Sequence, residues 1–317
     1  MKILAVGDTH ARTKRICEYY KLTDEIIRIA KKQKPDIIVL LGDDLHNHSI
    51  VHSIQLKAVT ELIMQLSEIA HVYKIIGNHE IISPQNFLEE DHHFHSFKCV
   101  KNVTIVDKPV VRDNLLFVPF VPQRRFNEAI KNIDLNNIRI IFAHQEFVGV
   151  KTNGDHESSC GDSYDIENPT IVSGHIHLKQ SFNNIHYVGA PVQTTFADEI
   201  ERYVAIIDDF DIQYIPVENI TKYITHEINL KEELPNKIDY NKDDRNRIII
   251  KGSLTEYKTF RSSKLFKELT NNNFIITPKI NNEHINLKKT KVKTFQEIIS
   301  EQLTDDIKDL WNSINQS

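Results

Sequence analysis

Hydrophobic and polar positions in the first 80 residues follow two alternating periods. Short apolar runs that end at a glycine, Lys2–Gly7, Asp36–Gly42 and Val72–Gly77, are typical of buried strands. The segments between them, Arg15–Lys32 and Ile50–Ala70, carry apolar residues at helical spacing among charges. This strand-helix-strand-helix-strand order predicts a mostly parallel sheet with right-handed crossovers.

The region beyond about residue 110 has a different pattern. It contains short apolar runs with little helix between them, which favours a second, more antiparallel sheet packed on the first. The fold class expected is therefore α/β. The runs that we interpret as strands are Leu115–Phe120, Arg139–Ala143, Thr170–Gly174, Ile185–Val188, Tyr203–Ile207 and Ile212–Ile215.

The last hundred residues are rich in Lys and Asn. They show one strand-helix-strand pattern, with a strand at Arg247–Gly252, a helix near Ser262–Leu269 and an apolar run at 273–278. A basic run, Lys288–Thr294, precedes apolar residues at helical spacing from Thr294 to Ile314. We therefore expect three parts: residues 1–217, a small α+β cap that could contact DNA at 218–287, and a basic linker with an amphipathic helix at 288–317.

Composition narrows the functional classes. The chain is 40% hydrophobic and 26% charged, which excludes a mainly disordered protein. Its net charge of −5 provides no global basic field, so any DNA contact would use a local patch or metal ions. The cysteines Cys17, Cys99 and Cys160 fit no zinc or disulfide spacing, and no apolar stretch is long enough to span a bilayer. We expect an intracellular, cytoplasmic protein without membrane contact.

Titratable residues follow each predicted central strand. The strand ends read KILAVGDTH, IIVLLGDDLH, YKIIGNHE, IRIIFAHQE and TIVSGHIH. In open α/β sheets the carboxyl ends of the strands converge, and ligands bind there. The sequence thus predicts that one edge of the sheets gathers Asp8, His10, Asp43, His46, Asn78, His79, His144, His175 and His177.

Oxygen and imidazole ligands without cysteine indicate Mn, Fe or another hydrolytic metal rather than structural zinc. Asp8 and His10 lie two positions apart, so in an extended chain they point to the same side. The ligands exceed what one ion requires and fit two ions about 3.5–4 Å apart that share a carboxylate. Asp43 is the natural bridge. Glycines before the ligands permit tight turns and close approach of a phosphate: Gly7, Gly42, Gly77 and Gly174.

In this order, the blocks GDTH, GDDLH, GNHE, AHQ and GHIH resemble the signature of the calcineurin-like metallophosphoesterases, over roughly residues 1–215. The resemblance implies a two-sheet αββα sandwich with two divalent ions, for which we expect Mn²⁺. By the motif match, one ion would be held by Asp8, His10, Asp43 and His177. The other would be held by Asp43, Asn78, His144 and His175.

Two segments resemble the SbcD/Mre-type DNA nuclease subunits, including those of phage recombination. They are the GDDLH block and His186–Glu199, HYVGAPVQTTFADE. The resemblance implies that His46 acts on the substrate, although an ordinary loop histidine is the alternative. The chain departs from the subfamily pattern at Asp44, where an apolar residue is usual, at Ala190, where Ser or Thr is usual, and in AHQ, where GH is commoner.

The expected function is a dinuclear, metal-dependent DNA nuclease, exo- or endonucleolytic, that serves DNA repair or recombination. His79 follows the ligand Asn78 and is the candidate for protonating the leaving group, with orientation of a ligand as the competing role. The alternative is a small-substrate metallophosphoesterase that acts on cyclic nucleotides, dinucleoside polyphosphates or phosphoproteins. A scaffold that keeps only the fold would require lost ligands, and the sequence retains all of them.

The resemblance also implies partners, namely DNA and an SbcC/Rad-type ATPase bound through the C-terminal helix. The stripe from Phe295 to Ile314 includes the single tryptophan, Trp311, and suits a partner's groove as well as it suits the chain's own core. A homodimer is compatible with the sequence. The tract Asp91–His95 resembles a metal site but is interpreted as a solvated loop. Asp44 and His48 receive no role.

Overall fold

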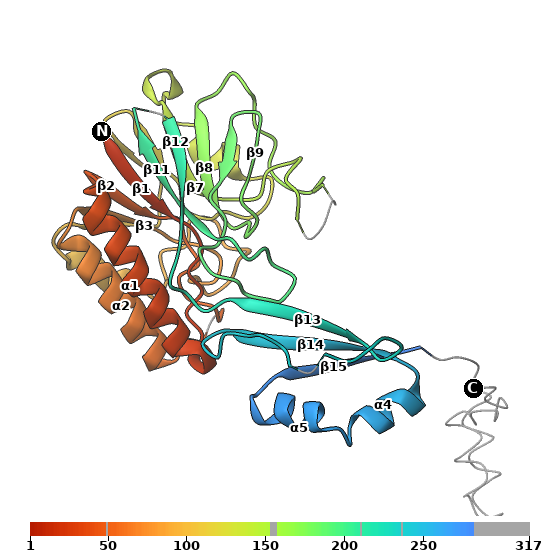
Figure 1. Ribbon diagram of the computed structural model, residues 1–317. Helices are drawn as coiled ribbons and strands as arrows, with labels where there is room; N and C mark the ends of the chain where they lie inside the picture. Colours follow the sequence, from red (N-terminus) through yellow and green to blue (C-terminus); the bar gives the residue numbers. More distant parts are fainter. Residues whose placement is uncertain (49, 153–156, 210, 236, 282–317) are drawn as a thin grey trace, which may run out of the picture.

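The computed structural model describes residues 1–48, 50–152, 157–209, 211–235 and 237–281. These residues form two six-stranded sheets and a three-stranded sheet (Figure 1). The α/β fold with two large sheets and a small α+β cap is confirmed. The predicted helix from Thr294 to Ile314 lies outside the described residues.

The first sheet has the strand order β12-β11-β1-β2-β3-β4. Its four mutually parallel strands are β1 (Lys2–Val6), β2 (Ile37–Leu40), β3 (His71–Ile75) and β4 (Val103–Val106). Two antiparallel strands extend it beyond β1, namely β11 (Tyr203–Asp208) and β12 (Asp211–Pro216). The apolar runs predicted as central strands are buried here on both faces of the sheet.

Two long helices cover the outer face of this sheet, α1 (Ile16–Gln33) and α2 (Ser53–Ser67) (Figure 1). Their apolar residues recur at helical spacing and pack into one core with the strands. Helix α1 ends at Gln33, and the next residue, Lys34, adopts a left-handed conformation and donates its backbone N–H to the Ala30 carbonyl. Pro35 follows, so the helix ends where the sequence predicts.

The second sheet has the order β5-β6-β7-β8-β10-β9, and β6, β7, β8 and β10 are mutually parallel. Its strands are β5 (Val110–Arg112), β6 (Leu115–Phe117), β7 (Ile140–His144), β8 (Thr170–Gly174), β9 (Gln180–Phe182) and β10 (Ile185–Tyr187). The expectation of a more antiparallel second sheet is wrong. Loops and the five-residue helix α3 (Phe126–Ile130) make crossovers that carry little helical periodicity.

The last two strands predicted for the second sheet belong to the first, as β11 and β12. The reason is visible in β11, which is buried on both faces. Val204 and Ile206 pack into the core beneath the helices, whereas Ala205 and Ile207 pack between the two sheets. An apolar strand of this kind fits the interior of either sheet, so its pattern alone does not assign it.

An apolar core between the two large sheets holds them together. The rings of Tyr73 on β3 and Phe117 on β6 stack with centroids 4.0 Å apart, and Phe142 on β7 follows at 5.3 Å from Phe117. These residues belong to one buried apolar cluster contributed by both sheets. Packing of this kind brings the carboxyl ends of strands from both sheets to a common edge.

The third sheet is parallel, in the order β13 (Tyr223–Asn229), β14 (Arg245–Gly252) and β15 (Ile275–Ile280). Helices α4 (Leu254–Phe260) and α5 (Lys264–Asn271) cover one of its faces (Figure 1). It has an apolar core of its own. Helix α5 matches the predicted helix, whereas the sequence pattern missed β13 and α4. No helix in the described ranges is long and apolar enough to cross a membrane.

Candidate dinuclear metal centre

Five strand ends meet at one edge of the two large sheets. Strands β1, β2 and β3 of the first sheet and β7 and β8 of the second supply the side chains. Because these strands run parallel within each sheet, their carboxyl ends lie together. The structure therefore brings together all seven residues predicted as metal ligands: Asp8, His10, Asp43, Asn78, His144, His175 and His177.

Three of these residues form a first cluster. The Nε2 atoms of His10 and His177 lie 2.8 Å apart, and the His177 Nε2 is 3.7 Å from Oδ2 of Asp8. Asp8 is fully buried, and its two carboxylate oxygens accept the backbone N–H of His175 at 3.1 and 3.0 Å. Two imidazole nitrogens and a fixed carboxylate thus face one small volume.

The other four residues form a second cluster. The Nε2 of His144 lies 3.1 Å from Oδ1 of Asn78 and 3.3 Å from Oδ2 of Asp43. The Nδ1 of His175 lies 2.9 Å from the same Asn78 oxygen. The opposite ring nitrogen of His144, Nδ1, lies 2.7 Å from the Leu41 carbonyl. A donor at that nitrogen leaves the Nε2 lone pair facing the cluster, as in histidines that ligate metals.

Backbone conformation at the centre is unusual. His10, Asp43 and His175 adopt left-handed φ angles of 46°, 52° and 77°. Non-glycine residues rarely adopt this region, and each instance costs on the order of 1–3 kcal/mol. Such strain gathers at functional sites, where the surrounding structure enforces it. Here it falls on three of the seven predicted ligands.

The glycines of the motifs make room for protein side chains. A Cβ added at Gly77 would lie 2.2 Å from Oδ1 of Asp43, and one at Gly174 would lie 2.7 Å from Oδ1 of Asp8. At Gly42 it would lie 2.3 Å from Nδ1 of His144. A Cβ at Gly7 would meet the backbone of the loop after β10. The prediction that these glycines admit a phosphate is therefore wrong, because ligand side chains and backbone occupy the space.

Burial sets the charges of the centre. It lowers the pKa of His175 to about 3 and holds the pKa of His10 well below its usual value, while it raises the pKa of Asp8 to about 7. Burial also disfavours charge on His144, yet the Asp43 carboxylate outweighs it and raises the pKa of His144 to about 9. His10, His175 and His177 are therefore neutral and offer free lone pairs to a cation, whereas a cation at the second cluster would have to displace the proton of His144.

The two further histidines predicted to take part in the reaction lie beside the first cluster. Ring nitrogens of His10, His46 and His79 lie within 4.8 Å of one another. The Nδ1 of His79 is 2.5 Å from the His46 carbonyl, and its Nε2 is 3.6 Å from Oδ2 of Asp43. The ring of His79 also stacks on that of His48, with centroids 3.8 Å apart. Burial lowers the pKa of His46 to about 4.

Sequence analysis missed a buried ionic group beneath the ligands. The Nζ of Lys74 lies 2.8 Å from Oδ2 of Asp44 and 2.8 Å from Oε1 of Glu80. Glu80 also accepts the backbone N–H groups of Asp44 and Gly77 at 2.6 and 2.7 Å. The sequence does contain a signal for this ion pair, namely a lysine inside the apolar strand VYKIIG with a glutamate six residues later.

The interpretation of Asp91–His95 as a solvated loop is wrong for His92. Its side chain is fully buried, and its Nε2 lies 3.2 Å from Oδ2 of Asp107. Lys98 pairs with the same carboxylate oxygen. Within the protein, His92 and Lys98 thus both contact the Asp107 carboxylate. Ligand atoms of His92, His95 and Asp107 also lie within 4.8 Å of one another.

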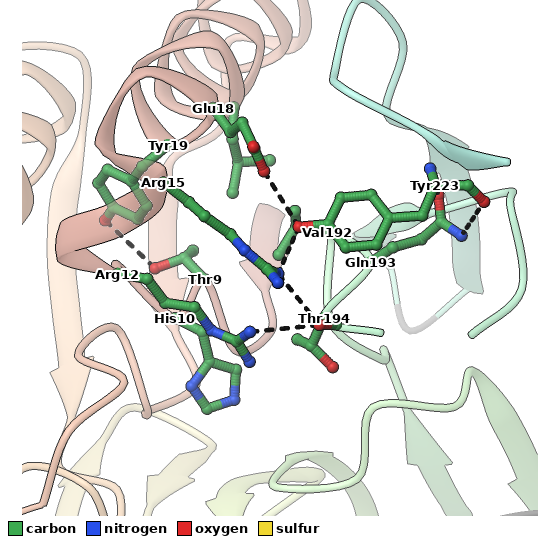
Figure 2. Close-up of a pocket in the computed structure, with 11 residues that line it drawn as sticks. Thr9, His10, Arg12, Arg15, Glu18, Tyr19, Val192, Gln193, Thr194 and Tyr223 are labelled. Atoms are coloured by element: carbon green, nitrogen blue, oxygen red, sulfur yellow. Dashed lines mark hydrogen bonds between the residues drawn. The ribbon is translucent and has the colours of Figure 1, made fainter. Parts of the chain in front are cut away.

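Recesses open on two sides of the centre. On the Asn78 and His175 side, a cavity of about 520 Å³ is lined by Phe120, Gln123 and Arg124 among others. On the His10 side, a recess of about 20 Å³ is lined by residues that include Arg12, Arg15, Thr194 and Tyr223 (Figure 2). A molecule bound at the two clusters can thus extend into the larger cavity, whereas the smaller recess has room for about one water or one phosphate oxygen.

Comparisons with known proteins agree with this geometry. The family model of calcineurin-like phosphoesterases matches residues 1–179. Phosphoesterase 078R of Invertebrate iridescent virus 3 is 31% identical over 294 residues, which are 88% of this chain and 84% of that protein. Phosphoesterase 244L of Invertebrate iridescent virus 6 is 34% identical over 282 residues, which are 83% and 98% of the two chains.

A more distant similarity is to exonuclease subunit 1 of Enterobacteria phage T4. It is 22% identical over 215 residues, which cover 63% of this chain and 62% of the phage protein. The family model covers more than half of the chain, and both viral phosphoesterases align with most of it. With the two-sheet fold and the strand-end motifs, these matches show that the chain belongs to the calcineurin-like phosphoesterase family, hydrolases of phosphoester bonds.

Proposed function

We propose that this chain is a dinuclear-metal-dependent phosphodiesterase that cleaves DNA. The observation that carries the proposal is the large recess beyond His175, which can receive one ester arm of a phosphodiester. The recess beyond His10 is too small for a nucleoside, so the other arm would lie outside it. The larger recess has room for a nucleoside, and its Phe120 offers a ring on which a base could stack.

The donor set fits two divalent ions. Asp8, His10 and His177 would hold one, and Asn78, His144 and His175 the other, with Asp43 shared between them. The imidazole content favours Mn²⁺ over Mg²⁺, which prefers oxygen ligands. When bound, such a pair supplies an activated water and neutralises charge on the phosphoryl oxygens.

His79 is our candidate for the catalytic acid. The hydrogen bond between its Nδ1 and the His46 carbonyl, together with the stack on His48, fixes the ring. Its Nε2 therefore faces Asp43 and the space between the clusters. A proton on this nitrogen can pass to the leaving oxygen or neutralise the charge that develops there.

His46 has a different place. Its ring lies edge-on to that of His10, with centroids 5.4 Å apart. The low pKa keeps the ring uncharged at neutral pH, so it can donate or accept a hydrogen bond but adds no charge. We propose that it positions the nucleic-acid strand at the centre.

The similarity to exonuclease subunit 1 supports a nucleic acid as the substrate, and the viral phosphoesterases leave a smaller ester as the alternative. The test compares purified full-length protein, loaded with Mn²⁺, on labelled oligonucleotides, bis(p-nitrophenyl) phosphate and p-nitrophenyl phosphate. We expect cleavage of the oligonucleotides and the diester, with the monoester hydrolysed far more slowly. Preference for the monoester, with DNA intact, would support the small-substrate phosphoesterase instead.

We also propose that the protein works as one subunit with an SbcC/Rad-type ATPase that binds residues 288–317. The printed name of the phage relative, a subunit, is the support. Deletion of Lys293–Ser317 should leave hydrolysis of the small diester intact and abolish co-purification with the ATPase. Retention of the ATPase by the truncated chain would place its docking site elsewhere.

A further inference from the structure

Two arginines converge beside the first cluster. Nη1 of Arg12 and Nη1 of Arg15 donate to the same carbonyl oxygen, that of Thr194, at 3.2 and 3.1 Å (Figure 2). Together with His10 they line the smaller recess. A guanidinium carries five N–H donors, so each arginine of this pair retains donors beyond those bonds. Two positive charges therefore share one neutral acceptor next to a predicted metal ligand.

The acids around the arginine pair are engaged elsewhere. Oε1 of Glu18 pairs with Arg245 at 2.5 Å, and Oε2 accepts the Tyr223 hydroxyl at 3.0 Å. Asp198 accepts backbone and hydroxyl donors of the two threonines at 194 and 195. Within the described part of the chain, neither arginine of the pair forms an ion pair with a carboxylate. The positive charge of Arg12 and Arg15 is thus available to an anion.

The neighbouring segments are fixed around the pair. The side-chain oxygen of Gln193 accepts the backbone N–H of Tyr223 at 2.8 Å, and its side-chain nitrogen donates to the carbonyl of Tyr223 at 3.3 Å. These two hydrogen bonds join the segment His186–Glu199 to the first residue of β13. The guanidinium of Arg15 lies over the Tyr223 ring, 5.0 Å from its centroid, and also donates to its hydroxyl.

A further arginine lies on the third sheet and is linked to the pair by the ring of Phe196, whose centroid is 5.1 Å from that of Tyr223. Arg247 on β14 lies over the ring of Phe196, 4.6 Å from its centroid, and donates to the Thr225 hydroxyl at 3.0 Å. Its neighbours in sequence along β14, Ile248 and Ile250, point into the core beneath α4 and α5. Because side chains alternate along a strand, Arg247 points to the face that these helices leave uncovered (Figure 1).

The size of the recess limits what the pair can bind. About 20 Å³ holds one water or one phosphate oxygen and excludes a nucleoside. Contacts of this kind position a nucleic-acid backbone and carry no sequence information. We infer that Arg12, Arg15 and Arg247 bind successive phosphates of a polynucleotide strand on the His10 side of the scissile phosphate. This inference rests on the proposed function and adds the path of its substrate.

The test uses full-length protein with Arg12→Gln, Arg15→Gln and Arg247→Gln, each in turn. Lys14→Gln is the matched control, since this exposed lysine lies between the pair in sequence and does not line the recess. Fluorescence anisotropy of a labelled single-stranded oligonucleotide would be followed against salt concentration. Each lost contact should reduce the slope of log K against log salt by about 0.7, because fewer counterions are released.

In turnover, the three variants should lose more activity on the oligonucleotide than on bis(p-nitrophenyl) phosphate, whereas Lys14→Gln should match the unmodified protein on both. Folded variants with an unchanged salt slope, or with equal losses on both substrates, would overturn the inference. Arg247 stands far from the ligands in sequence, so its variant tests the path even where a change at Arg12 disturbs folding. Arginine-dependent binding without DNA cleavage would retain the path and reject the nuclease.

Discussion

The Nζ of Lys74 lies 2.8 Å from Oε1 of Glu80, and both side chains are fully buried. Asp44 approaches the same ammonium group at 2.8 Å. Through the backbone N–H groups that Glu80 accepts, this ion pair joins strand β3 to the loops that carry Asp43 and Asn78. Lys74 therefore positions ligands that it does not touch.

Replacement of Lys74 by methionine should lower the free energy of unfolding by roughly 3–5 kcal/mol, because two carboxylates would stay buried without their partner. Urea unfolding of the metal-free protein measures this loss. The control is Lys57→Met, which removes an exposed pair with Glu61 at 3.6 Å and should cost less than about 1 kcal/mol. Equal stability of the two variants would show that the buried pair does not hold the fold.

His79→Ala should keep its metal and lose most of its rate, by about 10²- to 10⁴-fold, since general acid catalysis contributes on that order. Metal content and turnover of the small diester, measured on the same preparation, separate the two effects. His186→Ala is a suitable control, because this histidine lies on β10 and its Nδ1 forms a hydrogen bond with the hydroxyl group of Ser181. Loss of metal in His79→Ala would make this residue a ligand.

His46→Ala should reduce digestion of DNA more than hydrolysis of bis(p-nitrophenyl) phosphate. The reason is that His46 lies beside His10, where we propose that it contacts the nucleic-acid strand and does not touch the reacting atoms. Rates on both substrates, each relative to the unmodified protein, measure the difference. An equal loss on both would assign His46 to the metal site or to the structure of the loop.

The stability of the metal-free protein should fall as the pH falls from about 7 to 5. Burial lowers the pKa of four imidazoles at the centre, so the unfolded chain binds more protons there below its histidine pKa of about 6.5. Their stabilisation is present above that pH and is lost on acidification. The four are His10, His46, His175 and His177.

Asp8 opposes this trend, because burial raises its pKa to about 7 and the folded protein binds its proton more tightly. His144 opposes it near pH 7 as well, because Asp43 raises its pKa to about 9. The four imidazoles outweigh these two groups, and each net proton changes the free energy of unfolding by about 1.4 kcal/mol per pH unit. Urea unfolding in chelator at both pH values measures the balance. Equal or greater stability at pH 5 would contradict the charges assigned to the centre.

The candidate centre could be predicted from the sequence because its signal is local. Each ligand follows an apolar strand directly, and parallel strands bring their carboxyl ends together whatever the details of packing. The buried ion pair required more. Lys74 stands in a strand pattern that does not show which carboxylates it meets, and those carboxylates follow two different strands.

Contacts between residues far apart in the sequence explain the remaining differences between the predicted and the observed structure. Arg12 meets the carbonyl of Thr194, 182 positions along the chain, and no periodicity in either segment indicates this pairing. Strand β11 has apolar residues toward both faces, so its sequence fits the first sheet and the second equally well. Only the complete packing places it beside β1.

The central claim is that this chain holds two ions that share Asp43. The most direct measurement is a crystal structure of the protein grown with Mn²⁺, with anomalous difference maps recorded near the manganese edge. We predict two peaks about 3.5–4 Å apart, one beside His10 and His177 and one beside His144 and His175, and neither peak in Asp43→Ala. A single peak, or two peaks that remain in Asp43→Ala, would contradict the account.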